Sequence, residues 1–144
     1  MKLSGYWFAT VYSGGEIKQR VEGHNVITSN GLSFVAGHLA GSVAAAATFT
    51  MAYIGLGTNA TAESAANTAL GAEVARTTGV VSSATGAIYR VTATFPSGTG
   101  TGAITEYGLF SSSSAGTMLS RDTEAVVNKG ANDELVVVTE ITLS

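Results

Sequence analysis

Short β-type runs separated by turn residues constrain the fold of this chain more than any other feature. Runs rich in aromatic and β-branched residues end at clusters of Gly, Ser or Asn, and these turn signals recur about every 8–12 residues. Long helical patterns do not alternate with these runs, so a parallel α/β sheet is not expected. The sequence therefore predicts a mainly β fold, an antiparallel β-sandwich or barrel of about eight strands with one short N-terminal helix.

The expected strands cover residues 6–12, 16–22, 51–56, 73–82, 86–95, 103–110, 117–121 and 134–143. In the run 86–95 apolar and polar residues alternate, which places one set of side chains on the core face. That set is Tyr89, Val91, Ala93 and Phe95. Ser13, Gly14 and Gly15 read as the turn of an N-terminal hairpin.

Residues 29–40 change to a helical period, with an apolar stripe made of Leu32, Val35, Ala36 and Leu39. Ser29 or Asn30 is placed to cap the start of this helix, and Gly41 is placed to end it. The run 42–50 mixes alanines with Thr-Phe-Thr. We interpret it as a loop that leads into the strand at 51–56.

A chain of 144 residues has the size of one domain, residues 1–144. We divide it into an N-terminal hairpin, residues 1–22, which is also a candidate anchoring arm, and a β-sandwich core, residues 23–144. Aromatic side chains concentrate binding energy at interfaces, and a strand can add to the exposed edge of a partner. The candidate interface residues in the arm are Tyr6, Trp7, Phe8 and Tyr12. Equally, these aromatic residues fill the core of the chain itself.

The composition favours contact with other protein surfaces. Charged residues make up 12% of the chain, about half the usual share, and apolar residues make up 45%. A chain so poor in charge is expected to associate with its own copies or with another protein. Its few cations form no basic stripe, which argues against nucleic acid as a partner. Apolar runs stay well below the ~20 residues of a spanning helix, so no membrane partner is expected.

A glycine motif after the apolar run 51–54 invites a nucleotide-binding interpretation. Gly55, Gly57 and Ala60 spell G-x-G-x-x-A, the relaxed dinucleotide fingerprint. A dinucleotide site needs these glycines to open a helix, but the residues that follow Gly57 have weak apolar periodicity. We interpret the glycines as relieving crowding where a strand ends, and we expect no cofactor.

Residues for catalysis or metal binding do not fall into a recognisable pattern. His24 and His38 are far apart in sequence and belong to no metal-binding spacing, and the chain has no cysteine and no G-x-S-x-G motif. The carboxylates lie near arginines and are interpreted as solvated groups or structural ion pairs. We therefore expect no catalytic residue, no metal and no enzymatic activity.

Four segments together resemble a pattern shared by virion proteins of tailed bacteriophages. They are NVITSNGLSFVAGHLAG (25–41), YIGLGTNATAESAANTALGAEVAR (53–76), GAITEYGLFSSSSAGTMLSR (102–121) and NKGANDELVVVTEITLS (128–144). The resemblance lies in their order and spacing, which include G-x-G-T, L-x-x-E-x-x-R and G-x-I-x-E-x-G-L-F. The first 22 residues lie outside it. Within these motifs, Arg76 and Glu106 are expected to form a buried ion pair that joins two strands and specifies their register.

The resemblance implies a non-enzymatic, all-β structural module. Its first expectation is a capsid decoration (cement) protein that binds the major capsid protein on the capsid exterior and stabilises the shell after assembly in the host cytoplasm. A tail-fibre, collar or neck attachment protein is the alternative, and a carbohydrate-binding module is a more distant one. A homo-oligomer is expected, and a trimer suits a threefold axis.

Overall fold

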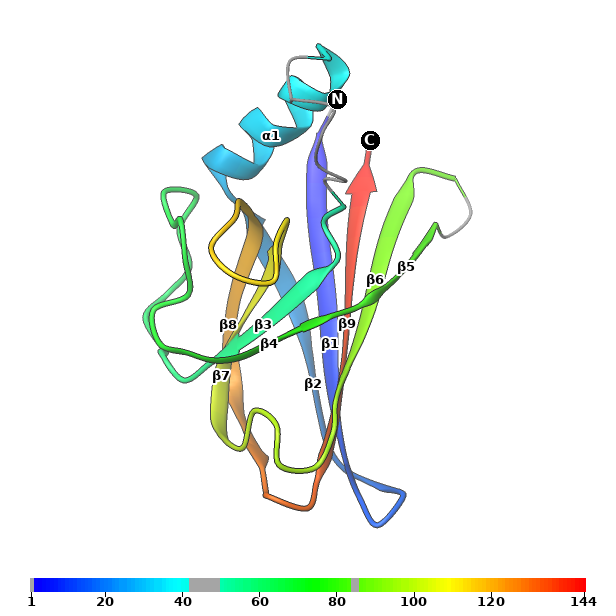
Figure 1. Cartoon of the computed structure of the whole chain (residues 1–144), viewed down its shortest axis with the longest axis vertical. Helices are drawn as coiled ribbons and strands as arrows, with labels where there is room; N and C mark the ends of the chain where they lie inside the picture. Colours follow the sequence, from blue (N-terminus) through cyan, green and yellow to red (C-terminus); the bar gives the residue numbers. More distant parts are fainter. Residues whose placement is uncertain (1, 42–49, 84–85) are drawn as a thin grey trace.

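The computed structural model describes residues 2–41, 50–83 and 86–144, and within these ranges the chain forms nine strands and one helix. In order they are β1 (Leu3–Ser13), β2 (Glu16–Ile27), α1 (Ser29–Leu39), β3 (Tyr53–Gly57), β4 (Glu73–Thr78), β5 (Val80–Ser83), β6 (Ile88–Phe95), β7 (Gly102–Phe110), β8 (Met118–Lys129) and β9 (Glu134–Leu143). The strands pair antiparallel in a nearly closed barrel, and α1 lies across one end (Figure 1). The expected mainly β fold with one short helix is confirmed.

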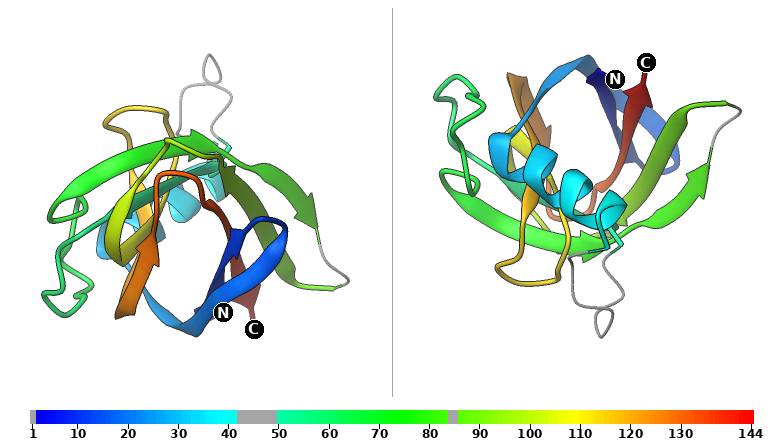
Figure 2. Two further views of the ribbon diagram at one scale, coloured as in Figure 1. Left: turned by 90° about the horizontal axis from the view of Figure 1, so that it is seen from below. Right: turned by 90° about the horizontal axis from the view of Figure 1, so that it is seen from above.

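The two ends of the sheet meet in one bent segment of the chain. The strand order is β4-β3-β7-β8-β2-β1-β9-β6-β5, and the end strands β4 and β5 are separated only by Gly79. β4 pairs with β3 and β5 pairs with β6, so this segment bridges the sheet (Figure 2). The single strand expected over 73–82 is therefore two strands. Gly79 donates to the carbonyl of Ala52 at 2.6 Å, and a Cβ at this position would collide with the Val91 side chain.

The core fills the inside of the barrel. Its largest members are Trp7, Phe95, Ile54, Leu56, Ile104, Leu109 and Leu135, each at most 1% exposed. Val91, Ala93 and Phe95 point inward from β6, and Tyr89 packs against them in part, as its alternation predicted. The Trp7 ring stacks on Tyr107 with centroids 4.1 Å apart.

Helix α1 begins one residue earlier than its predicted caps imply. Thr28, the residue that follows β2, is the N-cap, and its hydroxyl accepts from the N–H of Gly31 at 2.9 Å, a role predicted for Ser29 or Asn30. Gly41 follows the helix with φ of 65°, as expected of a helix terminator. The 11-residue helix is too short to cross a membrane, and the structure describes no other helix. The loop interpretation of 42–50 falls almost wholly on residues 42–49, which lie outside the described ranges.

The N-terminal hairpin forms part of the barrel wall. β1 pairs with β2 on one edge and with β9 on the other, from Leu3 opposite Leu143 to Tyr12 opposite Glu134. Both edges of β1 are therefore occupied, and this strand has no free edge to add to a partner. Residues 1–22 are therefore built into the wall, and Trp7 belongs to the core, while an anchoring role for the outward side chains of this hairpin stays a prediction.

Replacing Phe95 by alanine is expected to lower the free energy of unfolding by about 3–5 kcal/mol, because the ring is fully buried and its loss leaves a cavity. Urea unfolding followed by the fluorescence of Trp7, the single tryptophan, measures this change. Thr94→Ala, on the exposed face of the same strand, should change it by less than about 0.5 kcal/mol. Equal effects of the two substitutions would contradict the assignment of faces.

Candidate interaction surface

Two aromatic residues of β1, Tyr6 and Phe8, lie on the outer side of the barrel wall. Alternation along the strand turns Trp7 inward, where it is 1% exposed, and turns Tyr6 and Phe8 outward, where they are partly exposed. The rings of Tyr6 and Phe8 lie 6.4 Å apart. Tyr12 is also partly exposed, near the hairpin turn and beside Glu134. The four candidate interface residues thus split between one core residue and three surface residues.

Polar side chains from β2 surround the two outward rings. The Arg20 guanidinium lies 4.6 Å from the centroid of the Phe8 ring, a cation–π distance. The His24 ring meets Tyr6 edge-on at 5.5 Å. A hydrogen bond to the Glu22 carboxylate raises the pKa of Tyr6. We call this group, Tyr6, Phe8, Arg20, Glu22 and His24, the outer aromatic face.

The same surface continues across β9, β6 and β5 as an apolar row. The strand registers place Phe8 opposite Val138, Val138 opposite Thr92, and Thr92 opposite Val80. Val138 is 7% exposed although it points outward, while Val80 at the end of the row is 72% exposed. An apolar centre with a charged rim is the arrangement found in protein–protein interfaces. Its groups can stack, pack and form hydrogen bonds with a partner.

On another part of the wall, Glu106 forms a buried ion pair with a residue that the sequence interpretation missed. Glu106 is fully buried, and its Oε2 lies 2.9 Å from Nη2 of Arg121. Arg76 pairs instead with Glu73 at 2.7 Å and lies over the Phe110 ring at 3.5 Å. The predicted pair of Arg76 and Glu106 is wrong, because β3 lies between their strands, β4 and β7.

The signal for the true pair was present but weak. Glu106 and Arg121 lie in β7 and β8, two strands joined by the loop that contains SSSSAG. In an antiparallel hairpin, residues at matching distances from the loop lie opposite each other. Arg121 lies opposite Gly108, and Glu106 is the neighbour of Gly108 on the same face of β7. Bulges at two points of this ladder shift the register, so counting from the loop alone would not have found the pair.

The buried pair fastens the long connection from β3 to β4 onto the barrel. Glu106 accepts hydrogen bonds from the backbone N–H groups of Gly71 at 2.9 Å and Ala72 at 2.7 Å. Arg121 donates to the side-chain oxygen of Asn67 at 3.2 Å. Every oxygen of this carboxylate is therefore used in holding the structure together, and the group is not placed to act as an acid or base.

The glycine motif makes room for this arrangement. A Cβ on Gly57 would collide with the Glu106 side chain, and a Cβ on Gly55 would crowd the Phe110 ring. The chain continues from Gly57 into the β3–β4 connection and not into a helix. The interpretation that these glycines relieve crowding at a strand end is confirmed.

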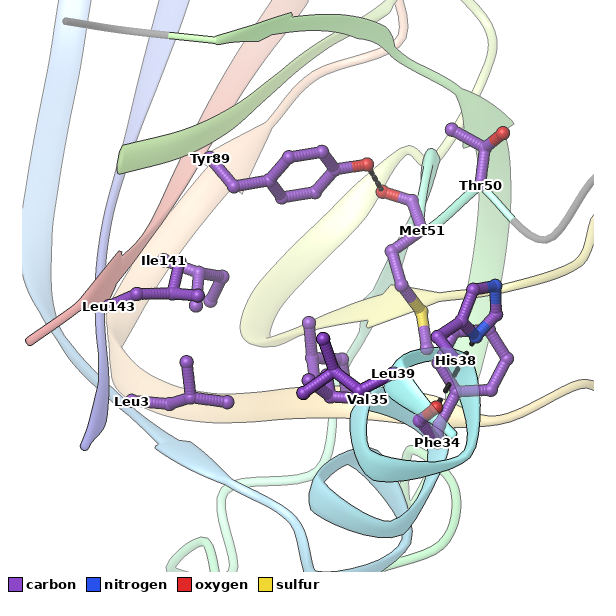
Figure 3. Close-up of a pocket in the computed structure, with 11 residues that line it drawn as sticks. Leu3, Phe34, Val35, His38, Leu39, Thr50, Met51, Tyr89, Ile141 and Leu143 are labelled. Atoms are coloured by element: carbon purple, nitrogen blue, oxygen red, sulfur yellow. Dashed lines mark hydrogen bonds between the residues drawn. The ribbon is translucent and has the colours of Figure 1, made fainter. Parts of the chain in front are cut away.

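An apolar pocket of about 460 Å³ lies between α1 and the adjoining end of the barrel (Figure 3). Its lining consists of Leu3, Phe34, Val35, His38, Leu39, Thr50, Met51, Tyr89, Leu119, Ile141 and Leu143. The Tyr89 hydroxyl donates to the Met51 carbonyl at 2.9 Å, and the His38 ring packs on Phe34 with centroids 4.5 Å apart. Most of these side chains are apolar, so the pocket offers a surface for apolar contact.

The two histidines stay apart, with His24 on the outer aromatic face and His38 on the helix. Within residues 2–41, 50–83 and 86–144, no group of three His, Cys, Asp or Glu side chains is arranged to hold a metal ion. Comparison with protein-family models, with curated proteins and with solved structures found no match for this chain.

Replacing Glu106 by glutamine is expected to lower the free energy of unfolding by about 3–5 kcal/mol, because it leaves the buried Arg121 cation without its partner. Glu73→Gln breaks the more exposed ion pair with Arg76 and should cost at most about 1 kcal/mol. Chemical unfolding of the two variants beside the wild-type protein measures both values. A small effect at Glu106 would show that the buried pair does not hold the fold.

Proposed function

We propose that this chain is a non-enzymatic structural protein of a tailed-bacteriophage particle, and that it acts as a capsid decoration protein. In this proposal the outer aromatic face binds the exterior of the major capsid protein and so stabilises the shell. The observation that carries the proposal is this face itself, because it combines Tyr6 and Phe8 with an apolar row and a charged rim. The resemblance of the four segments to phage virion proteins supplies the biological setting.

The position of the face in the barrel supports a role in docking. β1 and β9 are interior strands of the sheet, and each is paired along both edges. Side chains on such strands are held in place before a partner arrives, so binding orders few additional groups. Preorganisation of this kind lowers the entropic cost of association.

The polar residues of the four segments also favour a scaffold rather than a catalyst. Glu106 and Arg121 neutralise each other and hold the β3–β4 connection. Lys129 is buried, and its ammonium donates to the carbonyls of Asp133 at 2.7 Å and Pro96 at 3.0 Å. These side chains have structural partners, which leaves the exposed surfaces as the parts of the molecule available for function.

A particle with many equivalent sites suits a chain with little charge. Each copy would make a modest contact, and the symmetry of a shell repeats that contact many times. Contacts between neighbouring copies would add to it, and a trimer would suit a threefold axis of the shell. A position on the tail or neck would use the same face and would differ only in the partner.

A second candidate function has an observation in its favour. Exposed aromatic rings flanked by polar side chains can also bind a sugar ring by stacking and hydrogen bonding, and the outer aromatic face has both components. Trp7 takes no part in such a site because it lies in the core. Binding of the purified protein to a glycan array would favour this candidate over the capsid.

Replacing Tyr6 and Phe8 together by serine is expected to weaken binding to undecorated phage heads by at least about 30-fold, because aromatic residues at an interface centre contribute about 2 kcal/mol or more. Heads assembled from the major capsid protein of the same phage, mixed with the variant and sedimented, give the measurement. Val74→Ser serves as the control, since Val74 is 46% exposed but lies on β4, away from this face.

The proposal fails if the wild-type protein does not sediment with the heads, or if the double variant binds as well as the Val74→Ser control. Electron microscopy of particles carrying the labelled chain separates the capsid exterior from the tail. Circular dichroism of each variant shows whether the barrel is intact, so a loss of binding is not mistaken for a loss of folding.

A further inference from the structure

Four side chains that line one interior cavity of the barrel carry unpartnered polar atoms. They are Trp7, Asn25, Tyr107 and Asp122, and together with Ser120 and Thr139 they line one interior cavity. Among the residues that the structure describes, the Trp7 Nε1, the Asn25 Oδ1 and the Tyr107 hydroxyl have no hydrogen-bond partner, and neither carboxylate oxygen of Asp122 has one beyond a contact with the backbone N–H of the adjacent Thr123. Asp122 is 1% exposed.

Such a group of atoms is costly unless it is satisfied. A buried polar atom without a hydrogen bond costs about 1–3 kcal/mol, and an isolated buried charge costs more. The neighbouring hydroxyls do not meet the need. Asn25 uses its amide nitrogen on Ser120 at 3.2 Å and on Thr139 at 3.4 Å, which leaves its oxygen directed elsewhere.

We propose that Asp122 is a neutral carboxylic acid in the folded barrel, and that with Trp7, Asn25 and Tyr107 it forms an internal site for an ordered water molecule. The cavity offers about 10 Å³, close to the smallest volume that holds one water. This inference does not depend on the proposed function. It assigns a role to a buried acid that neither the ion pairs nor the outer face explains.

The hydrogen-bond donors and acceptors around the cavity can be satisfied by one water molecule together with a proton on the Asp122 carboxyl group. The indole N–H of Trp7 can only donate, and the amide oxygen of Asn25 can only accept. The Tyr107 hydroxyl and a protonated Asp122 can each do both. A water molecule that accepts from the indole N–H and donates to the amide oxygen would therefore satisfy both of these groups, neither of which can change its role by rotating a hydroxyl. An ionised Asp122 would remove one donor and leave a bare charge in the core.

The charges that face Asp122 also oppose its ionisation. Burial is the main cause that raises the pKa of Asp122 to about 8, and the carboxylates of Glu124 on β8 and Glu63 on the β3–β4 connection add to it. The backbone N–H of Thr123 and the Arg121 guanidinium act in the opposite direction, more weakly. Burial, followed by the proximity of Asp122, raises the pKa of Tyr107 on β7, so that phenol stays neutral as well.

The site lies beside the end of the short ladder between β2 and β8. The ladder between β2 and β8 consists of Val26 opposite Arg121 and Ile27 opposite Ser120. The next positions beyond this short ladder are Asn25 and Asp122, the two residues of the site. Ionisation of Asp122 would favour opening of the barrel at this seam, because water could then reach the charge.

The proposal has a definite sign for the dependence of stability on pH. The folded-state pKa of Asp122 lies above its value in the unfolded chain, so between those values the folded protein binds one more proton. The contribution of this group is therefore complete below about pH 4 and is lost as the pH rises towards about 8. This direction is the reverse of that expected for an acid in an ion pair.

The test is urea unfolding of the wild-type protein and of Asp122→Asn at a series of pH values. Relative to the variant, the unfolding equilibrium constant of the wild type should rise by up to about tenfold for each pH unit between about 5 and 8. Glu16→Gln, on the exposed start of β2, is the matched control and should follow the wild-type profile. Parallel profiles for the wild type and Asp122→Asn would overturn the proposal.

Carbon-13 NMR of the Asp122 carboxyl in the wild-type protein provides a second measurement if the variant does not fold. A titration midpoint well above the usual aspartate range supports the neutral acid, and a midpoint near 4 contradicts it. Water-to-protein nuclear Overhauser effects at the Trp7 indole N–H test for the water. Their absence would refute the water site even if Asp122 proved to be neutral.

Discussion

Strict alternation of side chains along a closed wall is the constraint on which the rest of this structure depends. In a barrel each strand residue points either into the core or away from it, so neighbouring residues meet opposite environments. On β1 this rule buries Trp7 and presents Tyr6 and Phe8, and it gives one strand both a packing role and a binding surface. The segment around Gly79 joins the two end strands of the sheet, β4 and β5. Side chains therefore alternate between the inside and the outside around the whole barrel wall.

Alternation also explains why the sequence predicted the fold better than the site. Period and turn signals located the helix and most strands, since these depend on neighbours along the chain. The aromatic run at residues 6–12 showed that β1 mattered, but not that both its edges would be occupied. Long-range pairing decides that, as it decides that Glu106 meets Arg121 and not Arg76. Counting residues from the loop also does not predict the bulges that shift the register between β7 and β8.

The barrel treats two buried acids in contrasting ways. The Glu106 carboxylate pairs with the Arg121 guanidinium and accepts from three backbone N–H groups, those of Asn59, Gly71 and Ala72. Asp122 faces the core, where an indole, a phenol and an amide line the same cavity. The first acid joins a connection to the wall, and the second makes the interior polar at one point. Neither is exposed on the surface that we assign to binding.

Arg121 and Asp122 are consecutive on β8 and face opposite sides of the wall. If the pairing of β8 shifted by one residue, the Arg121 guanidinium would enter the apolar interior without the Glu106 carboxylate. Asp122 would then take the position of Arg121 on the outside of the wall. Both changes would destabilise the fold together, so a one-residue shift in the register of this strand is strongly disfavoured. Two adjacent residues thus allow only one alignment for a strand whose ladder with β2 is too short to enforce it.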